Sequence, residues 1–286
     1  MLTDEDLPAL WQQLGIPGVF DVHTHFLPEP VLRKVWAYFD AAQQNYGVPW
    51  PISYRGDDDA RLAQLRAMGV RRFTALVYAH KPGMAAWLNQ WALDFVAGVP
   101  ECVPTATFYP EPEAADYVAE ALARGARLFK IHLQVGDFDP RDRRLDPVWD
   151  LLSEASAPVL VHCGSAPLAG RFTGAGPIGD VLARFPELRV IVAHLGAGEF
   201  AEFVSMAGER VWLDTTMALT DFMQSLRPFP PELLPRLRDL SAQGRVLFGS
   251  DFPNIPYPYA HQVEVLRDAG LDMRQVMWDG PLALFG

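Results

Sequence analysis

Two histidines separated by one residue, His23 and His25, are the best candidates in this sequence for binding a metal ion. They end an apolar run at residues 19–25 that is typical of a β-strand. Alternate side chains of a strand point to the same face, roughly 7 Å apart along the backbone, so the two imidazoles can converge on one cation. Two ordinary histidines on a half-exposed strand would give the same pattern, so the pair needs partners elsewhere in the chain.

Such partners stand at the ends of later apolar runs. His162 and His194 each end a run rich in valine, and Asp251 directly follows another. Any one of them is compatible with a buried polar group of the core. Barrel enzymes, however, carry their chemistry at the carboxyl ends of their strands. Imidazoles and a carboxylate together suit a borderline cation such as Zn²⁺, with room for a water, and we therefore predict a divalent metal site.

A lysine and a further histidine extend this group. Lys130 and His132 lie on the same face of the predicted strand at residues 128–133. A lysine that faces a barrel interior needs a carboxylate, a substrate or a metal site as partner, because burial disfavours its charged form. A salt-bridged lysine at the barrel mouth is the alternative, and the role of Lys130 is left open.

Other polar residues carry weaker signals. His80, after the second strand, lines a pocket or is solvated, and Asp21 and Asp214 orient a metal ligand or serve a buried hydrogen-bond network. Arg55 binds a substrate carboxylate, or belongs to a hydrophobic cluster of its own loop. The aromatic residues of that loop are Trp36, Trp50 and Tyr54.

The elements that must position these residues alternate regularly along the chain. Strand-like runs are expected at residues 19–25, 72–78, 103–107, 128–133, 159–162, 190–194, 211–215 and 246–250. Helical patterns are expected at residues 57–68, 84–96, 113–123, 147–155, 178–185, 200–207, 231–240 and 259–269. This alternation predicts parallel strands joined by crossover helices. A doubly wound open sheet has the same periodicity, but the first strand lacks a glycine-rich phosphate loop, which favours a (β/α)8 TIM barrel.

Length and composition fit one such barrel. The chain has 286 residues, half of them apolar, and is predicted to be a single α/β domain. Residues 1–18 form a lead-in, and residues 28–56 a βα-loop insertion after the first strand. A second long loop is expected at 164–177, and such loops build the rim of a barrel site.

The same composition excludes several classes of function. The net charge of −11, without a cluster of basic residues, argues against nucleic acid as a partner. The sequence has no apolar run of membrane-spanning length and an acidic N-terminus, so a cytoplasmic protein is expected. Cys102 and Cys163 are interpreted as small core residues.

Five motifs in this order, DVHTHF, FKIH followed by FDPRDRRLDP, VLVHCG, VIVAHLG and LFGSDFP, resemble the amidohydrolase superfamily. The resemblance is to its amidohydrolase-2 branch of metal-dependent hydrolases and aminocarboxymuconate-semialdehyde decarboxylase-like enzymes, and it runs from about residue 19 to the end. The stretch WDGPLALFG departs from the pattern, because relatives usually carry an asparagine there.

The resemblance implies a metal ligand set and two designs for the site. His23, His25, His162 and Asp251 match the ligands of a single metal, with His194 as a catalytic group. The alternative is a binuclear site, in which His194 and a carboxylated Lys130 hold a second metal. We expect one divalent metal, Zn²⁺ rather than Mn²⁺.

Hydrolysis of a small-molecule amide, ester or lactone is the predicted reaction. The metal would activate a water, Asp251 would take its proton, and His194 would stabilise the developing oxyanion. Non-oxidative decarboxylation of a small carboxylic acid is the first alternative, with Arg55 or Arg171 holding an acidic substrate in either case. A metal-free lactonase or a non-catalytic binding barrel is the second. The sequence does not reveal the oligomeric state, and a homodimer is the commonest assembly of such enzymes.

Overall fold

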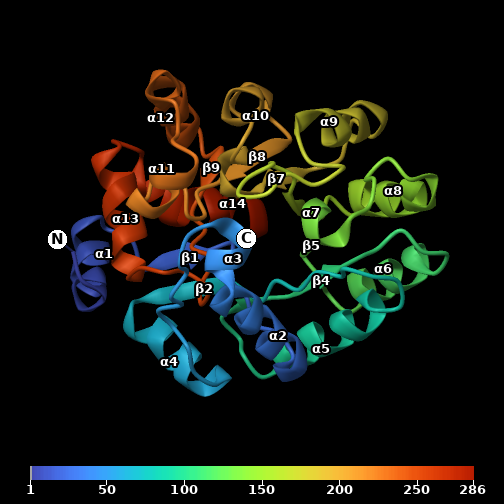
Figure 1. Ribbon diagram of the computed structural model, residues 1–286, viewed down its shortest axis with the longest axis horizontal. Helices are drawn as coiled ribbons and strands as arrows, with labels where there is room; N and C mark the ends of the chain where they lie inside the picture. The colour runs from blue at the N-terminus through green and yellow to red at the C-terminus, as the bar shows by residue number, and fades with distance from the viewer. Residues whose placement is uncertain (1) are drawn as a thin grey trace. The chain divides into compact units, whose positions relative to one another are not determined.

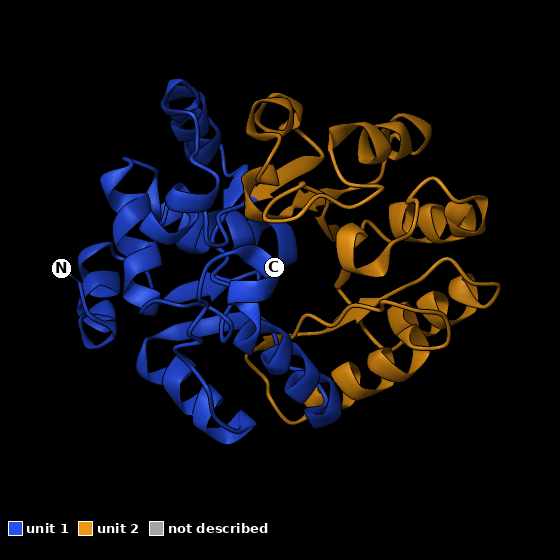
Figure 2. Cartoon of the chain, viewed as in Figure 1, with its two compact units in different colours: residues 1–74, 214–286 blue, residues 75–213 orange. Residues whose placement is uncertain are grey.

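The computed structural model describes residues 2–286 of the chain. The chain forms two compact units, each held together by its own internal contacts (Figure 2). Unit 1 joins the described residues up to Thr74 with Asp214–Gly286, and unit 2 is Ala75–Leu213. Within residues 2–286, no helix is both long and apolar enough to cross a lipid bilayer.

Unit 1 contains the first two strands and the last one. Strand β1 (Val19–Asp21) pairs in parallel with β2 (Val70–Thr74). Beyond β1 the backbone continues beside the segment that follows β9 (Val246–Leu247), because Val22 N–H donates to the Phe248 carbonyl and His25 N–H to the Phe252 carbonyl. The helices of this unit are α1 (Leu7–Gln13), α2 (Glu29–Asp40), α3 (Ala42–Tyr46), α4 (Asp58–Ala67), α11 (Asp221–Leu226), α12 (Leu234–Ala242), α13 (Tyr259–Asp268) and α14 (Gly280–Phe285).

Unit 2 contains a run of parallel strands paired in sequence order. They are β4 (Thr105–Thr107), β5 (Leu128–His132), β6 (Val159–His162), β7 (Val190–Val192) and β8 (Val211–Asp214), preceded by β3 (Cys102–Val103). Its helices are α5 (Ala85–Ala97), α6 (Ala114–Ala123), α7 (Leu133–Gly136), α8 (Asp146–Glu154), α9 (Ala175–Arg184) and α10 (Phe200–Met206). Helices α6, α8 and α9 lie along one face of these strands (Figure 1).

Burial explains why these short runs form strands. The valines, leucines and isoleucines of β6 and β7 are fully buried, as parallel strands covered on both faces require. The cysteines Cys102 and Cys163 are free and buried, which confirms their interpretation as core residues.

Several predicted boundaries were wrong. The second strand spans Val70–Thr74 rather than residues 72–78, and the third run is divided between β3 and β4 at Pro104, which has no N–H to donate to a ladder. Strand β1 ends at Asp21, and β7 ends at Val192, so His194 lies in the short 3-10 helix η3 (Ala193–Gly196). The insertion at 28–56 is not a loop throughout, because it contains α2 and α3.

Candidate metal centre

Three side chains of unit 1 converge at the end of the first strand. The ligand-capable atoms of His23, His25 and Asp251 all lie within 4.8 Å of one another. Asp251 Oδ1 is 3.5 Å from His23 Nε2 and 3.0 Å from His25 Nε2. Both histidines are buried, whereas the Asp251 side chain is 14% exposed. Two imidazole nitrogens and one carboxylate oxygen form a donor set that fits Zn²⁺ or Mn²⁺.

A second carboxylate orients the first of these histidines. His23 Nδ1 lies 2.8 Å from Asp214 Oδ2, and the Asp214 side chain is fully buried. An ionised carboxylate only accepts hydrogen bonds, so this contact places the ring proton on Nδ1. Nε2 then keeps its lone pair, on the side of the ring that faces Asp251 and where a cation would be held. Of the two roles that the sequence left open for Asp214, the contact with the His23 ring favours the orienting one.

Asp21 holds the backbone of both segments that carry the three converging side chains. Its Oδ1 accepts from the His23 N–H at 3.1 Å and the Ser250 N–H at 3.2 Å. Its Oδ2 accepts from the Ser250 hydroxyl at 2.6 Å and the Tyr259 hydroxyl at 2.8 Å. Burial raises the pKa of Asp21 to about 7, and the four hydrogen bonds oppose that rise. Asp21 thus ties β1 to the segment that carries Asp251.

Asp251 itself adopts an unusual backbone conformation. Its φ is +76°, in the left-handed region that residues other than glycine rarely occupy. The Asp251 N–H donates to the His23 carbonyl at 2.9 Å, which fixes the turn against the histidine pair. Such strain persists where surrounding contacts determine the geometry, and functional sites are a common place for it.

Unit 2 brings together three histidines, two from adjacent strands and one from the turn after β7. The rings of His132 and His162 stack with centroids 3.9 Å apart, and the His194 ring lies 4.7 Å from His162. The strand register explains the first contact, because His132 of β5 is paired with His162 of β6. Tyr78 packs against His132 at 5.2 Å. The candidates His132, His162 and His194 therefore form one cluster.

His194 reaches this cluster from η3 rather than from a strand. Its φ is +57°, and that of Leu195 is +53°, so two consecutive residues other than glycine are left-handed. The sequence showed the histidine but not this conformation, because nothing in a run of valines predicts a left-handed turn. Lys130, in β5, is buried with 1% exposure, and its backbone carbonyl accepts from the Thr107 hydroxyl at 2.7 Å.

The remaining candidates lie at the surface. His80 and Arg171 are exposed, and the Arg171 guanidinium lies over its neighbour Phe172 at 5.0 Å. Arg55 forms an ion pair with Asp40 and lies over the Trp36 ring at 5.3 Å. Substrate binding by these three residues stays a prediction.

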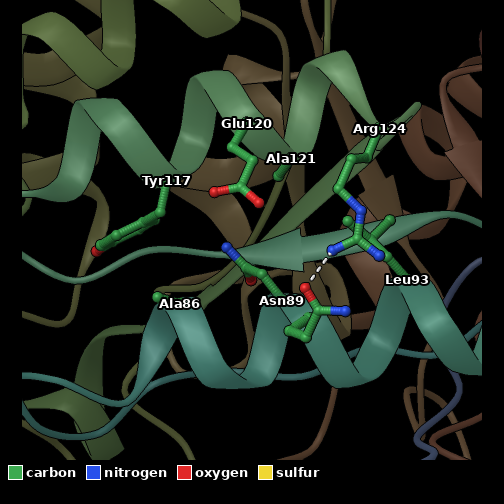
Figure 3. A pocket seen from close by; sticks show the side chains of 8 residues that line it. Ala86, Asn89, Leu93, Tyr117, Glu120, Ala121 and Arg124 are labelled. Atoms are coloured by element: carbon green, nitrogen blue, oxygen red, sulfur yellow. Dashed lines mark hydrogen bonds between the residues drawn. The ribbon is translucent and has the colours of Figure 1, made fainter.

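A hollow between α5 and α6 in unit 2 offers little for binding (Figure 3). Arg124 at its rim donates to Gln90 at 2.7 Å and to Asp94 at 2.8 Å. The Asn89 amide exchanges two hydrogen bonds with the Thr107 backbone. These polar groups join the two helices to each other and to β4.

Both the sequence and the fold of this chain are similar to those of known proteins. A family model described as amidohydrolase matches residues 20–286, whereas no curated protein matches the chain. An uncharacterised TIM-barrel protein from Bordetella bronchiseptica is similar in structure, with a TM-score of 0.71 and 17% identity over 93% of this chain and 98% of that one. This similarity confirms the TIM-barrel fold class.

Two further structures resemble the chain at low identity. A candidate 2-pyrone-4,6-dicarboxylic acid hydrolase from Pseudomonas putida has 20% identity over 94% of this chain and 98% of that one, with a TM-score of 0.60. A 5-carboxyvanillate decarboxylase from Novosphingobium aromaticivorans, in complex with manganese and 4-hydroxy-3-methoxy-5-nitrobenzoic acid, has 15% identity over 95% and 97%, with a TM-score of 0.57. Because the family model matches residues 20–286 of this chain, the chain belongs to the amidohydrolase-2 family.

Proposed function

We propose that this protein is a metal-dependent hydrolase of a small-molecule amide, ester or lactone. The observation that carries the proposal is the convergence of His23 Nε2, His25 Nε2 and Asp251 Oδ1, with Asp214 fixing the His23 ring. A structural relative described as a candidate hydrolase of a pyrone dicarboxylic acid supports the lactone class.

His23, His25 and Asp251 would hold one divalent cation, and Zn²⁺ is our first choice among metals. Mn²⁺ is the second, since a related decarboxylase was crystallised with it. His162 is proposed as a further ligand from its motif and its position at a strand end of the barrel fold. When bound, such a cation polarises a substrate carbonyl and lowers the pKa of water toward neutrality.

The residues of the chain then perform the proton transfers. Asp251, the one partly exposed member of the three, accepts the proton of the attacking water and passes it to the leaving group. His194 donates a hydrogen bond to the carbonyl oxygen as negative charge develops there. Lys130 is the residue that a second metal would require in its carboxylated form.

Non-oxidative decarboxylation is the second candidate. It is favoured by the 5-carboxyvanillate decarboxylase structure, which shares the fold over almost the whole chain. The same three ligands would hold a cation that binds the substrate carboxylate, and a site acid would protonate the carbon that loses CO₂. Arg55 and Arg171, together with His80 and His132, are proposed to contact an acidic substrate.

Activity assays distinguish the two reactions. Purified protein loaded with Zn²⁺ or Mn²⁺ is tested on a panel of lactones, esters and amides, and CO₂ release is measured from aromatic and enal carboxylic acids. We expect turnover in the first panel alone. Turnover confined to the carboxylic acids would establish the second candidate instead.

Two variants then test the roles of the residues. Asp251→Asn and His194→Asn are expected to lower kcat by about 10²-fold to 10⁴-fold on a confirmed substrate, because each removes one proton-transfer or oxyanion contact. Asp239→Asn, an exposed change on α12, is the matched control. Folded, metal-loaded variants with the native rate would refute the assigned roles.

A further inference from the structure

We propose that Asn254 is a positioning residue for the metal ligand Asp251, and that Trp36 of α2 holds Asn254 in place. The proposal rests on the metal-dependent function proposed above. It assigns a role to the insertion at 28–56, whose helices contribute none of the three converging ligands.

Asn254 connects three segments of unit 1. Its backbone N–H donates to the Asp251 carbonyl at 2.8 Å, which closes the turn after the ligand. Its side-chain Oδ1 accepts from the Trp36 indole at 3.2 Å, and its carbonyl accepts from the Trp50 indole at 2.7 Å. Asn254 is 4% exposed, so the loss of either partner leaves a polar group that water reaches poorly.

The turn needs such support because of its conformation. Asp251 has a φ of +76°, which costs free energy for any residue with a Cβ atom. Its N–H is bound to His23 on one side, and its carbonyl is bound to Asn254 on the other. Both hydrogen bonds set the direction of the Cα–Cβ bond, and therefore the place of the carboxylate relative to His25.

Trp36 is a fixed anchor for the asparagine. The guanidinium groups of Arg55 and Arg61 lie 5.3 Å and 5.7 Å from the centre of its ring. Arg61 is fully buried and also lies 4.9 Å from the ring of Phe26, the residue that follows His25. Cation–π contacts of this kind restrain the ring that donates to Asn254.

The second indole makes the anchor more rigid. Trp50 is buried, and its ring centroid is 4.7 Å from that of Phe222 and 5.1 Å from that of Phe39 in α2. Helix α2 and the segment after α3 thus hold the same asparagine from two directions. A shift of α2 would move Asn254 and, through the turn, the carboxylate of Asp251.

A double-mutant cycle tests the proposal. Asn254→Leu removes the acceptor, Trp36→Phe removes the donor, and the double variant removes both. The dissociation constants of Zn²⁺ and Mn²⁺ are measured on metal-free protein by competition with a chromophoric chelator. Trp87→Phe, at an exposed position on α5, is the matched control for the loss of an indole.

We expect each single variant to weaken metal binding about tenfold, as loss of a group that orients a metal ligand commonly does. The double variant should be no weaker than the single ones, because both changes break the same hydrogen bond. The unfolding midpoint of metal-free Trp36→Phe should fall below that of Trp87→Phe, because the buried Asn254 side chain loses its hydrogen-bond donor. Weaker metal binding is the distinguishing result, because a merely structural role would lower the midpoint and leave metal binding unchanged.

Other results would contradict either the role of Asn254 or the metal-dependent function. Unchanged dissociation constants in folded variants, or losses that multiply in the double variant, would overturn the role of Asn254 and leave the metal site intact. Wild-type protein that binds neither cation would overturn the proposed function and this inference together. If Asn254→Leu does not fold, Trp36→Phe decides alone, because it leaves the asparagine and an aromatic ring in place.

Discussion

At the scale of residues, His23 presents one ring nitrogen to Asp214 and the other to Asp251. This arrangement suits the imidazole to bind a cation, because it fixes the tautomer and the direction of the ring. The spacing of His23 and His25 predicted that both rings share one face. It did not show which nitrogen faces the cation, because that depends on a carboxylate 191 residues away.

Asp214→Asn tests the orienting contact. An amide is a weaker acceptor than a carboxylate, and it can present its NH₂ group to Nδ1 instead, which favours the wrong tautomer of His23. We expect Zn²⁺ binding to weaken about 10-fold to 100-fold, measured by competition with a chelator. Asp239→Asn is the control, and an unchanged dissociation constant in Asp214→Asn would contradict the orienting role.

At the scale of elements, the site depends on the turns after the strands more than on the strands. The eight predicted runs correspond to the strands observed, because short, buried, valine-rich segments of an α/β chain rarely form anything other than β-strands. Their ends were less predictable. His194 and Asp251 occupy left-handed turns that depend on tertiary hydrogen bonds, and the helices in the insertion pack through contacts that periodicity does not reveal.

Gly164→Ala tests how closely two of these turns must approach. A Cβ atom at Gly164, just after β6, would lie 2.5 Å from the Ala197 carbonyl oxygen and 2.9 Å from the Gly196 carbonyl carbon. The substitution must therefore push the turn after His162 away from the turn that carries His194. We expect a loss of about 1–3 kcal/mol in unfolding free energy from denaturant titration.

The displacement should also impair catalysis, by about 10²-fold in kcat/KM, because shifts near 1 Å suffice for such losses. Gly176→Ala is the control, since nothing lies within 4 Å of its added Cβ. Native stability and rate in Gly164→Ala would show that the approach of the two turns is unimportant.

At the scale of the whole molecule, the chain runs from unit 1 through unit 2 and back. The family model spans both units, which favours the predicted single domain. The three converging side chains all belong to unit 1, although two of them precede Thr74 and one follows Asp214 in sequence. A bound cation would therefore join the first and last parts of the chain.

Metal removal tests this organisation. A cation bound only by the folded state stabilises it by about 3–4 kcal/mol at 100–1,000 times its dissociation constant. For a chain of this size we expect the unfolding midpoint to fall by about 5–10 °C on chelation. Calorimetry should show one transition that shifts as a whole. Two transitions, of which only one shifts, would contradict the single domain.

We propose above all that His23, His25 and Asp251 bind a divalent metal on which activity depends. The most direct test of this proposal is elemental analysis of protein purified without added metal or chelator, in the wild type and in His23→Asn/His25→Asn. We predict about one equivalent of a transition metal per chain in the wild type and less than about a tenth in the variant. A wild-type chain without metal, and without gain on reconstitution, would contradict the account.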